Sequence, residues 1–176
     1  MCKLMKRFYL TIVATLFVMC AFAEGIEIVQ GKASFVKTTG SIAVVFNWKD
    51  AKWDKRIPVR EEWKDDYQTY VDKGEEFFIK GFNKSSKKMK ITEGGSSADY
   101  VMTVNFLSFD KFFSATSIVP GFKHCIWAEI VVTDKRTGEM VCTYRTERFK
   151  GGRDFTIFDS FTESMEDFGS KLPKTY

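Results

Sequence analysis

The sequence predicts an α+β domain, built as a twisted, largely antiparallel sheet of about five or six strands with two amphipathic helices packed on one face. Two observations lead to this fold class. Several segments alternate apolar and polar residues with the period of two that a half-buried strand requires. Two longer segments repeat apolar residues every three or four positions, as a helix with one buried stripe does. The order strand, strand, helix, strands, helix favours one sheet with both helices on the same face.

Strands are assigned where the alternation is regular. The clearest segment is 41–48, where Ile42 and Trp48 mark the two ends of one apolar face. Alternation is lost at 107–109, and this loss predicts a bulge or a strand end there. The expected strands cover residues 26–37, 41–48, 88–92, 100–106, 125–133 and 140–149.

Two helices are expected from their apolar stripes. The first begins beside Pro58, which the first turn of a helix tolerates, and continues to Phe82 with a break at Gly74. The second ends before Pro173, because proline cannot continue a helix. Its stripe has 3-4-3-4 spacing and consists of Phe158, Phe161, Met165, Phe168 and Leu172.

The two segments on either side of Gly138 are expected to form a hairpin with Val132 opposite Cys142. In this register Cys125 lies about six positions further along the ladder, roughly 20 Å from Cys142. A disulfide needs Cα atoms within about 7 Å of each other. The sequence therefore predicts two free cysteines that act as small apolar residues.

Residues 1–23 are typical of a cleavable signal peptide. Three basic residues are followed by an apolar run over 8–19 and by the small-x-small sequence Ala21-Phe22-Ala23. The run is too short for a membrane-spanning helix, which needs about 20 residues. We therefore expect a chain that starts at Glu24 and is periplasmic or secreted, with one α+β domain over 24–176 and no transmembrane helix.

A lipid anchor at Cys20 is the competing interpretation of this segment. It requires the preceding residues to act as a lipobox, with a small residue before the cysteine and usually a leucine three positions before it. Met19 is bulky and Phe17 is a poor substitute for leucine. Simple cleavage after Ala23 is therefore favoured over lipidation.

Charge gives no support for a nucleic-acid partner. The chain has 27 Lys and Arg and 23 Asp and Glu, but residues 1–23 hold three of the basic residues and no acidic one. The remainder therefore has a net charge of only +1, without the strong basic excess of a nucleic-acid-binding domain. Local basic clusters occur around Lys87 and Arg148, and solvated faces are the expected role of both.

No recognisable catalytic, metal or cofactor motif occurs, so we expect a protein that is not an enzyme and binds no metal or cofactor. The single histidine, His124, is expected at a strand edge without a catalytic partner. Carboxylates occur in pairs, as glycosidases require. They lie on the polar sides of the predicted helices, where solvation is their expected role.

Aromatic residues provide the candidate binding positions. Trp53 lies between Trp48 and Trp63, which follow the core periodicities, so Trp53 is the one tryptophan left for a ligand. A loop is predicted over 111–123. Together with Phe109 and Asp110 just before it, this loop is unusually apolar. Such a loop either folds over the core or presents a contact surface, and the sequence favours neither. Its candidate contact residues are Phe109, Phe112, Phe113 and Phe122.

The entry Ala98-Asp99-Tyr100-Val101-Met102 into a strand, the hairpin over 132–141 and the C-terminal amphipathic helix together resemble those of uncharacterised exported bacterial proteins. The order of elements from Ile42 to Leu172 is also similar to that of small auxiliary lipoproteins with a TolB-N-terminal-like α+β fold. The resemblance implies a scaffolding or adaptor role in the envelope and carries over no catalytic residue.

The sequence therefore predicts an exported, non-enzymatic interaction or adaptor module of the bacterial cell envelope. It would bind an envelope protein through the apolar loop or through a sheet edge. The alternative is a binding protein for a hydrophobic or sugar ligand, held in a pocket between helices and sheet. An enclosed pocket above about 300 Å³ would favour this alternative.

Overall fold

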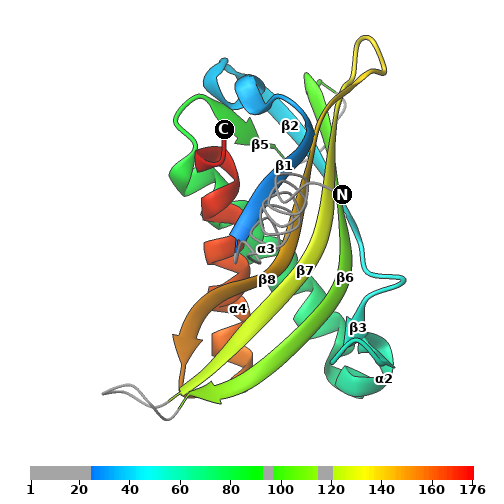
Figure 1. The fold of residues 1–176 in the computed structure, drawn as a ribbon, viewed down its shortest axis with the longest axis vertical. Helices are drawn as coiled ribbons and strands as arrows, with labels where there is room; N and C mark the ends of the chain where they lie inside the picture. The colour runs from blue at the N-terminus through cyan, green and yellow to red at the C-terminus, as the bar shows by residue number, and fades with distance from the viewer. Residues whose placement is uncertain (1–24, 93–96, 115–120) are drawn as a thin grey trace, which may run out of the picture.

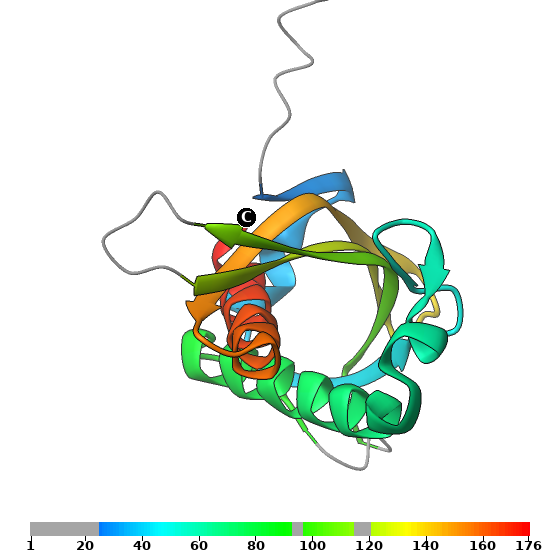
Figure 2. The same ribbon diagram turned by 90° about the horizontal axis from the view of Figure 1, so that it is seen from below.

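The computed structural model describes residues 25–92, 97–114 and 121–176. Over these residues the chain forms one curved sheet of eight strands, with two long helices on its concave face (Figures 1 and 2). The predicted signal peptide and the alternative anchor at Cys20 lie outside the described residues. Within them, no helix is both long and apolar enough to cross a membrane.

The elements follow one another along the chain, with short 3-10 turns after β1, α2 and α4. Their bounds are β1 Gly25–Gly31, β2 Gly40–Asn47, β3 Lys52–Trp53, β4 Ile57–Pro58, α2 Val59–Trp63, α3 Tyr67–Ser85, β5 Met89–Ile91, β6 Tyr100–Ser114, β7 Gly121–Asp134, β8 Met140–Asp154 and α4 Ile157–Lys171. The α+β class and the two main helices are therefore as the sequence predicted.

The sheet is mixed, and this corrects the prediction of five or six largely antiparallel strands. Its main order is β1-β8-β7-β6-β2-β5, and the short β3 pairs with both β4 and β6. β2 runs parallel to both β5 and β6. The reason is α3, which carries the chain back along the sheet after β2. The next strands, β5 and β6, therefore run in the same direction as β2.

The β7–β8 hairpin has the predicted register. Val132 is paired with Cys142, and Cys125 is paired with Lys150 further along the ladder. Both cysteines are buried free thiols. Burial raises the pKa of the Cys142 thiol to about 11, so it stays protonated and unreactive at neutral pH.

Strands β6, β7 and β8 extend further than the alternation predicted. The expected loop over 111–123 is wrong at both of its ends, because β6 continues to Ser114 and β7 begins at Gly121, while 115–120 lie outside the described residues. The predicted bulge is confirmed as a register shift between Phe106 and Ser108. This shift changes the phase of the alternation without ending the strand, so the sequence pattern stops before the pairing does.

The first helix breaks at a different place from the one predicted. Lys64 has a φ of 46° and separates α2 from α3, while Gly74 lies inside an uninterrupted α3. A Cβ at Gly74 would lie 3.1 Å from the ring of Phe161 and 3.3 Å from that of Trp48. Gly74 therefore gives space to two core rings and does not end the helix.

The core between helices and sheet consists mainly of aromatic rings. Trp63 of α2 stacks on Tyr70 of α3 at 4.6 Å between ring centroids and meets Phe161 of α4 at 5.3 Å. Phe109 of β6 lies 5.7 Å from Phe161. Each fully buried phenylalanine contributes roughly 1.5–3 kcal/mol. These rings therefore hold both helices to the sheet, as the stripe of the last helix predicted.

Helices α3 and α4 touch through their backbones. A Cβ at Gly81 of α3 would overlap the carbonyl oxygen of Glu166 in α4. On the other side of the same crossing, a Cβ at Gly169 would overlap the carbonyl oxygen of Phe78. Because the obstacle is backbone in both cases, only a shift of the helices could make room for a side chain.

We expect Gly81→Ala to lower the free energy of unfolding by about 1–3 kcal/mol, even though alanine favours a helix over glycine by about 1 kcal/mol. Urea unfolding followed by circular dichroism measures the change. Gly25→Ala is the matched control, because a Cβ there meets none of the described residues within 4 Å. A Gly81→Ala protein as stable as the Gly25→Ala protein would show that the helices are not in backbone contact.

Candidate functional site

Two of the five predicted binding residues lie in the core. Trp53 is 7% exposed and meets Trp63 edge to face, with 6.3 Å between centroids. Phe109 is 0% exposed and stacks on Trp48 at 5.5 Å. These two rings stabilise the packing of α2 and β6 and present no surface to a ligand.

The other three lie at the far end of the β6–β7 hairpin. Phe113 is 58% exposed, and its ring faces that of Phe122 across the two strands at 5.5 Å between centroids. Phe112 is half-buried and paired with Lys123. Alternation along the strands places Phe113 and Phe122 on the same sheet face as Phe109. The concave face therefore ends, at this hairpin, in the exposed ring of Phe113 and the half-buried ring of Phe122.

A further exposed ring at this end was missed by the sequence analysis. Phe155 is 69% exposed and follows Asp154, the partner of Phe122 in β8. Thr156 caps α4 by accepting a hydrogen bond from the backbone amide of Asp159, which places Phe155 one residue before the cap. An apolar residue there usually packs on the fourth helical residue, but that residue is the polar Ser160. The sequence did contain a signal for this exposed ring: the capping residue Thr156 is followed four positions later by the polar Ser160, so Phe155 has no apolar residue there to pack on.

One lysine lies on the same sheet face as these rings. Lys111 is paired with His124, and its ammonium group lies 5.4 Å from the centroid of the Trp53 ring. Lys123 follows Phe122 along β7 and is therefore on the opposite face. We call Phe113, Phe122 and Phe155, together with Lys111, the hairpin-end patch. Figures 1 and 2 show the ends of β6 and β7 to one side of α4.

His124 is a core residue and not an edge residue, contrary to the prediction. It is 0% exposed, and its Nδ1 lies 2.8 Å from the Oγ of Ser160 in α4. The imidazole meets the rings of Trp53 and Phe161 edge to face, each at 5.7 Å. Its Nε2 has no hydrogen-bond partner among the described residues. The histidine–serine pair joins α4 to β7 and is closed to a substrate.

Burial, aided by the charge of Lys111, lowers the pKa of His124 from 6.5 to about 4. The neutral ring therefore contributes its full stability above pH 6.5, and this contribution is lost as the pH falls toward 4. From pH 7 to pH 4.5, the free energy of unfolding of wild type should fall by about 2–3 kcal/mol more than that of His124→Gln. Urea unfolding at the two pH values measures it. Parallel pH profiles for the two proteins would contradict the burial of a neutral imidazole.

Carboxylates on the helices support the packing. Glu75 of α3 accepts a hydrogen bond from the indole nitrogen of Trp48 at 2.8 Å, and burial raises the pKa of Glu75. Glu166 of α4 accepts bonds from Lys80 and Lys84 of α3, and the bond from Lys80 is the main cause of its lowered pKa. Both carboxylates therefore tie elements together.

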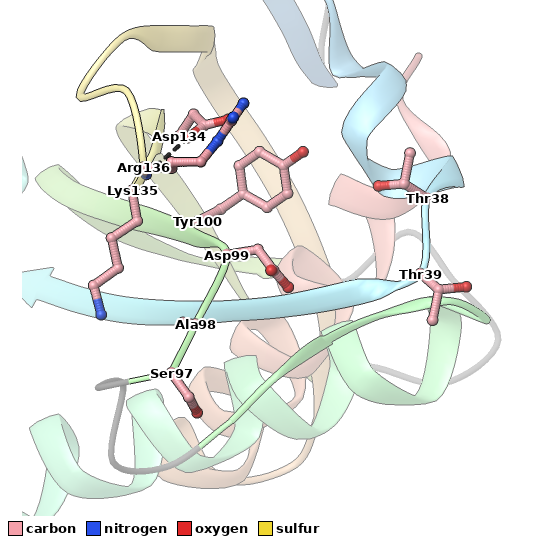
Figure 3. A pocket seen from close by; sticks show the side chains of 9 residues that line it. All are labelled: Thr38, Thr39, Ser97, Ala98, Asp99, Tyr100, Asp134, Lys135 and Arg136. Atoms are coloured by element: carbon pink, nitrogen blue, oxygen red, sulfur yellow. Dashed lines mark hydrogen bonds between the residues drawn. The ribbon is translucent and has the colours of Figure 1, made fainter.

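A hollow of about 490 Å³ opens where β6 begins and β7 ends (Figure 3). Two carboxylates line it, but each accepts bonds from nearby backbone. Asp99 accepts from the amide of Ser41 at 2.8 Å, and Asp134 accepts from the amide of Arg136 at 2.8 Å. These bonds fix the start of β2 and the β7–β8 turn. The lining residues are Thr38, Thr39, Ser97, Ala98, Asp99, Tyr100, Asp134, Lys135 and Arg136.

No family model matches the sequence. No curated protein matches it at a significant level. Among solved structures, the chain is similar to PelC from Paraburkholderia phytofirmans, solved as a dodecamer, with 13% identity, a TM-score of 0.46 and coverage of 85% of this chain and 97% of that one. A DUF330 protein from Xanthomonas campestris gives 10% identity, a TM-score of 0.40 and coverage of 82% and 87%.

A third similar structure is a homologue of a neuraminyllactose-binding haemagglutinin from Helicobacter pylori. It gives 8% identity, a TM-score of 0.36 and coverage of 83% of this chain and 87% of that one. Similarities this low assign neither a family nor a function. None of these three is described as TolB-like, so that resemblance stays a prediction.

Proposed function

We propose that this protein is an exported, non-enzymatic interaction module of the bacterial cell envelope, and that it binds a protein partner through the hairpin-end patch. The observation that carries the proposal is the exposure of Phe113 and Phe155, 58% and 69%, at one end of the sheet. Large exposed rings gathered in one place are typical of contact surfaces, and aromatic residues dominate binding energy in interfaces.

The strand that carries Phe113 also has a free edge. β6 is paired with β2 as far as Asn105 and with β3 at Ser108 and Phe109. Beyond this point, residues 110–114 pair only with β7 among the described strands. An unpaired edge offers backbone amides and carbonyls to an extended segment of a partner. Strand addition here would place the partner's side chains beside Phe112 and Phe113.

The charge at the patch indicates what the partner presents. Lys111 lies on the same sheet face as Phe113 and Phe122, so a complementary surface has a carboxylate beside an apolar centre. Burying each exposed phenylalanine contributes at most roughly 1.5–3 kcal/mol, part of which offsets the entropy of association. The two rings together therefore support a partner of moderate affinity, with strand addition supplying further binding energy.

The alternative ligand site between helices and sheet has less support. The space where such a pocket was expected is filled by aromatic rings: Phe109 stacks on Trp48 and meets Phe161 at a tilt. A hollow of about 430 Å³ beside Trp48 and Tyr67 lies at the margin of this core, and Trp48 itself is only 7% exposed. The aromatic residues that were expected to line a ligand pocket between helices and sheet therefore stabilise the core.

A photoreactive phenylalanine analogue at position 113 should cross-link one discrete partner in the native envelope. The same analogue at Val45, which is 52% exposed on β2, is the matched control and should give no such product. The double variant Phe113→Ser and Phe155→Ser should reduce co-purification of that partner at least tenfold. Its melting temperature should stay within about 2 °C of wild type, since both rings are exposed.

Equal cross-linking from both positions would contradict the proposal. So would a fall of several degrees in melting temperature for the double variant, because it would show that these rings pack against the body of the protein. The identified partner provides a further check. Its cross-linked segment should be extended and apolar, with an Asp or Glu next to the apolar residues.

Export is tested on the N-terminus of the protein recovered from its native host. Intact mass spectrometry should show a chain that begins at Glu24, because Ala21-Phe22-Ala23 fits the cleavage pattern of signal peptidase. A diacylated Cys20 would instead make the protein a lipoprotein. A full-length chain retained in the cytoplasm would contradict export.

A further inference from the structure

A hollow of about 560 Å³ lies at the opposite end of the helices from the hairpin-end patch. Three segments far apart in sequence form it: the 3-10 turn after β1, the connection from α3 to β5, and the C-terminal residues after α4. Four of the nine described lining residues are lysines, and no Asp or Glu occurs among them. The lining residues are Val36, Lys37, Ser85, Ser86, Lys87, Lys88, Pro173, Lys174 and Tyr176.

The four lysines of this hollow have no acidic partners in the part of the chain that the structure describes. They are Lys37, Lys87, Lys88 and Lys174. The Lys37 ammonium lies over the Tyr176 ring at 3.8 Å from its centroid. The side chains of the lining therefore have a net positive charge. Like charges held close together favour a bound anion.

Two neighbouring lysines, Lys84 and Lys90, have structural roles in this region. Lys84 pairs with Glu166 of α4, and Lys90 donates to the carbonyl oxygens of Asn83 and Ser86 at the end of α3. Lys87 and Lys88 lie between these two in the sequence, and their side chains make neither kind of bond to a described residue. The basic cluster that the sequence analysis assigned to solvent is therefore divided, with half of it fixing the fold and half facing the hollow.

Ser86 adds an independent observation. It lines the hollow, is 4% exposed, and its Oγ has no hydrogen-bond partner among the described residues. A buried hydroxyl without a partner is uncommon, because leaving it unsatisfied costs about 1–3 kcal/mol. A ligand with acceptor oxygens would satisfy this hydroxyl.

We propose that this hollow is a binding site for a phosphate-bearing ligand. A phosphate group presents several acceptor oxygens and up to two negative charges, which suits several ammonium groups and one hydroxyl better than a single carboxylate would. Lys87 and Lys88 approach it from the α3–β5 connection, and Lys37 and Lys174 from the other two segments. The site takes either a soluble phosphate ester or the headgroup of a phospholipid.

Calorimetric titration of the chain from Glu24 with pyrophosphate tests the site. In 20 mM buffer we expect a Kd below about 1 mM that rises at least tenfold in 300 mM NaCl, because ion pairs are screened. The double variant Lys87→Gln and Lys88→Gln should weaken binding at least tenfold, and Ser86→Ala about threefold. Lys49→Gln with Lys52→Gln is the control, since it removes two exposed lysines elsewhere on the surface and leaves the same net charge.

Equal weakening by the two double variants would overturn the proposal, because it would show binding to overall charge. Absence of binding at 5 mM pyrophosphate would overturn it as well. Co-sedimentation with vesicles separates the two sources. Binding to phosphatidylglycerol vesicles and not to phosphatidylcholine vesicles, lost in Lys87→Gln with Lys88→Gln, assigns a lipid headgroup. Pyrophosphate binding without vesicle binding assigns a soluble ester.

Discussion

The structure depends on the backbone contact between α3 and α4. Gly81 and Gly169 let each helix reach a carbonyl oxygen of the other, so the two helices form one layer. On its other side, α4 packs against Gly151 of β8 just as closely, since a Cβ there would overlap Ser164. The last helix is thus fixed between a helix and a strand, and its rings Phe161 and Phe168 can reach the sheet.

The position of this helix layer determines what stays uncovered. α4 begins at Ile157, and the ends of β6 and β7 lie to one side of it (Figure 1), so the rings of Phe113 and Phe155 in the hairpin-end patch stay exposed. At the other end, α3 stops at Ser85 and the chain after α4 closes beside it, which leaves the lysine-lined hollow. The two surfaces proposed for binding are therefore the two ends of one layer.

Periodicity predicted those parts of the fold that depend on local pattern. The stripe of α4, the register of β7 with β8 and the bulge near Phe106 all follow from spacing along the chain. The parallel pairing of β2 could not be predicted, because it depends on where α3 returns the chain. The buried His124 gave no local signal either, since its partner Ser160 is brought to it only by the packing of α4 on the sheet.

Native-state hydrogen exchange tests the role of the helix contact most directly. If the crossing governs the fold, backbone amides near Gly81 and Gly169 exchange only through global unfolding, with the same free energy as the central strands β6 and β7. Amides of 110–114 should exchange faster, through local opening of the free edge. Exchange of the α4 amides by an independent opening at much lower free energy, with the sheet still protected, would contradict the account.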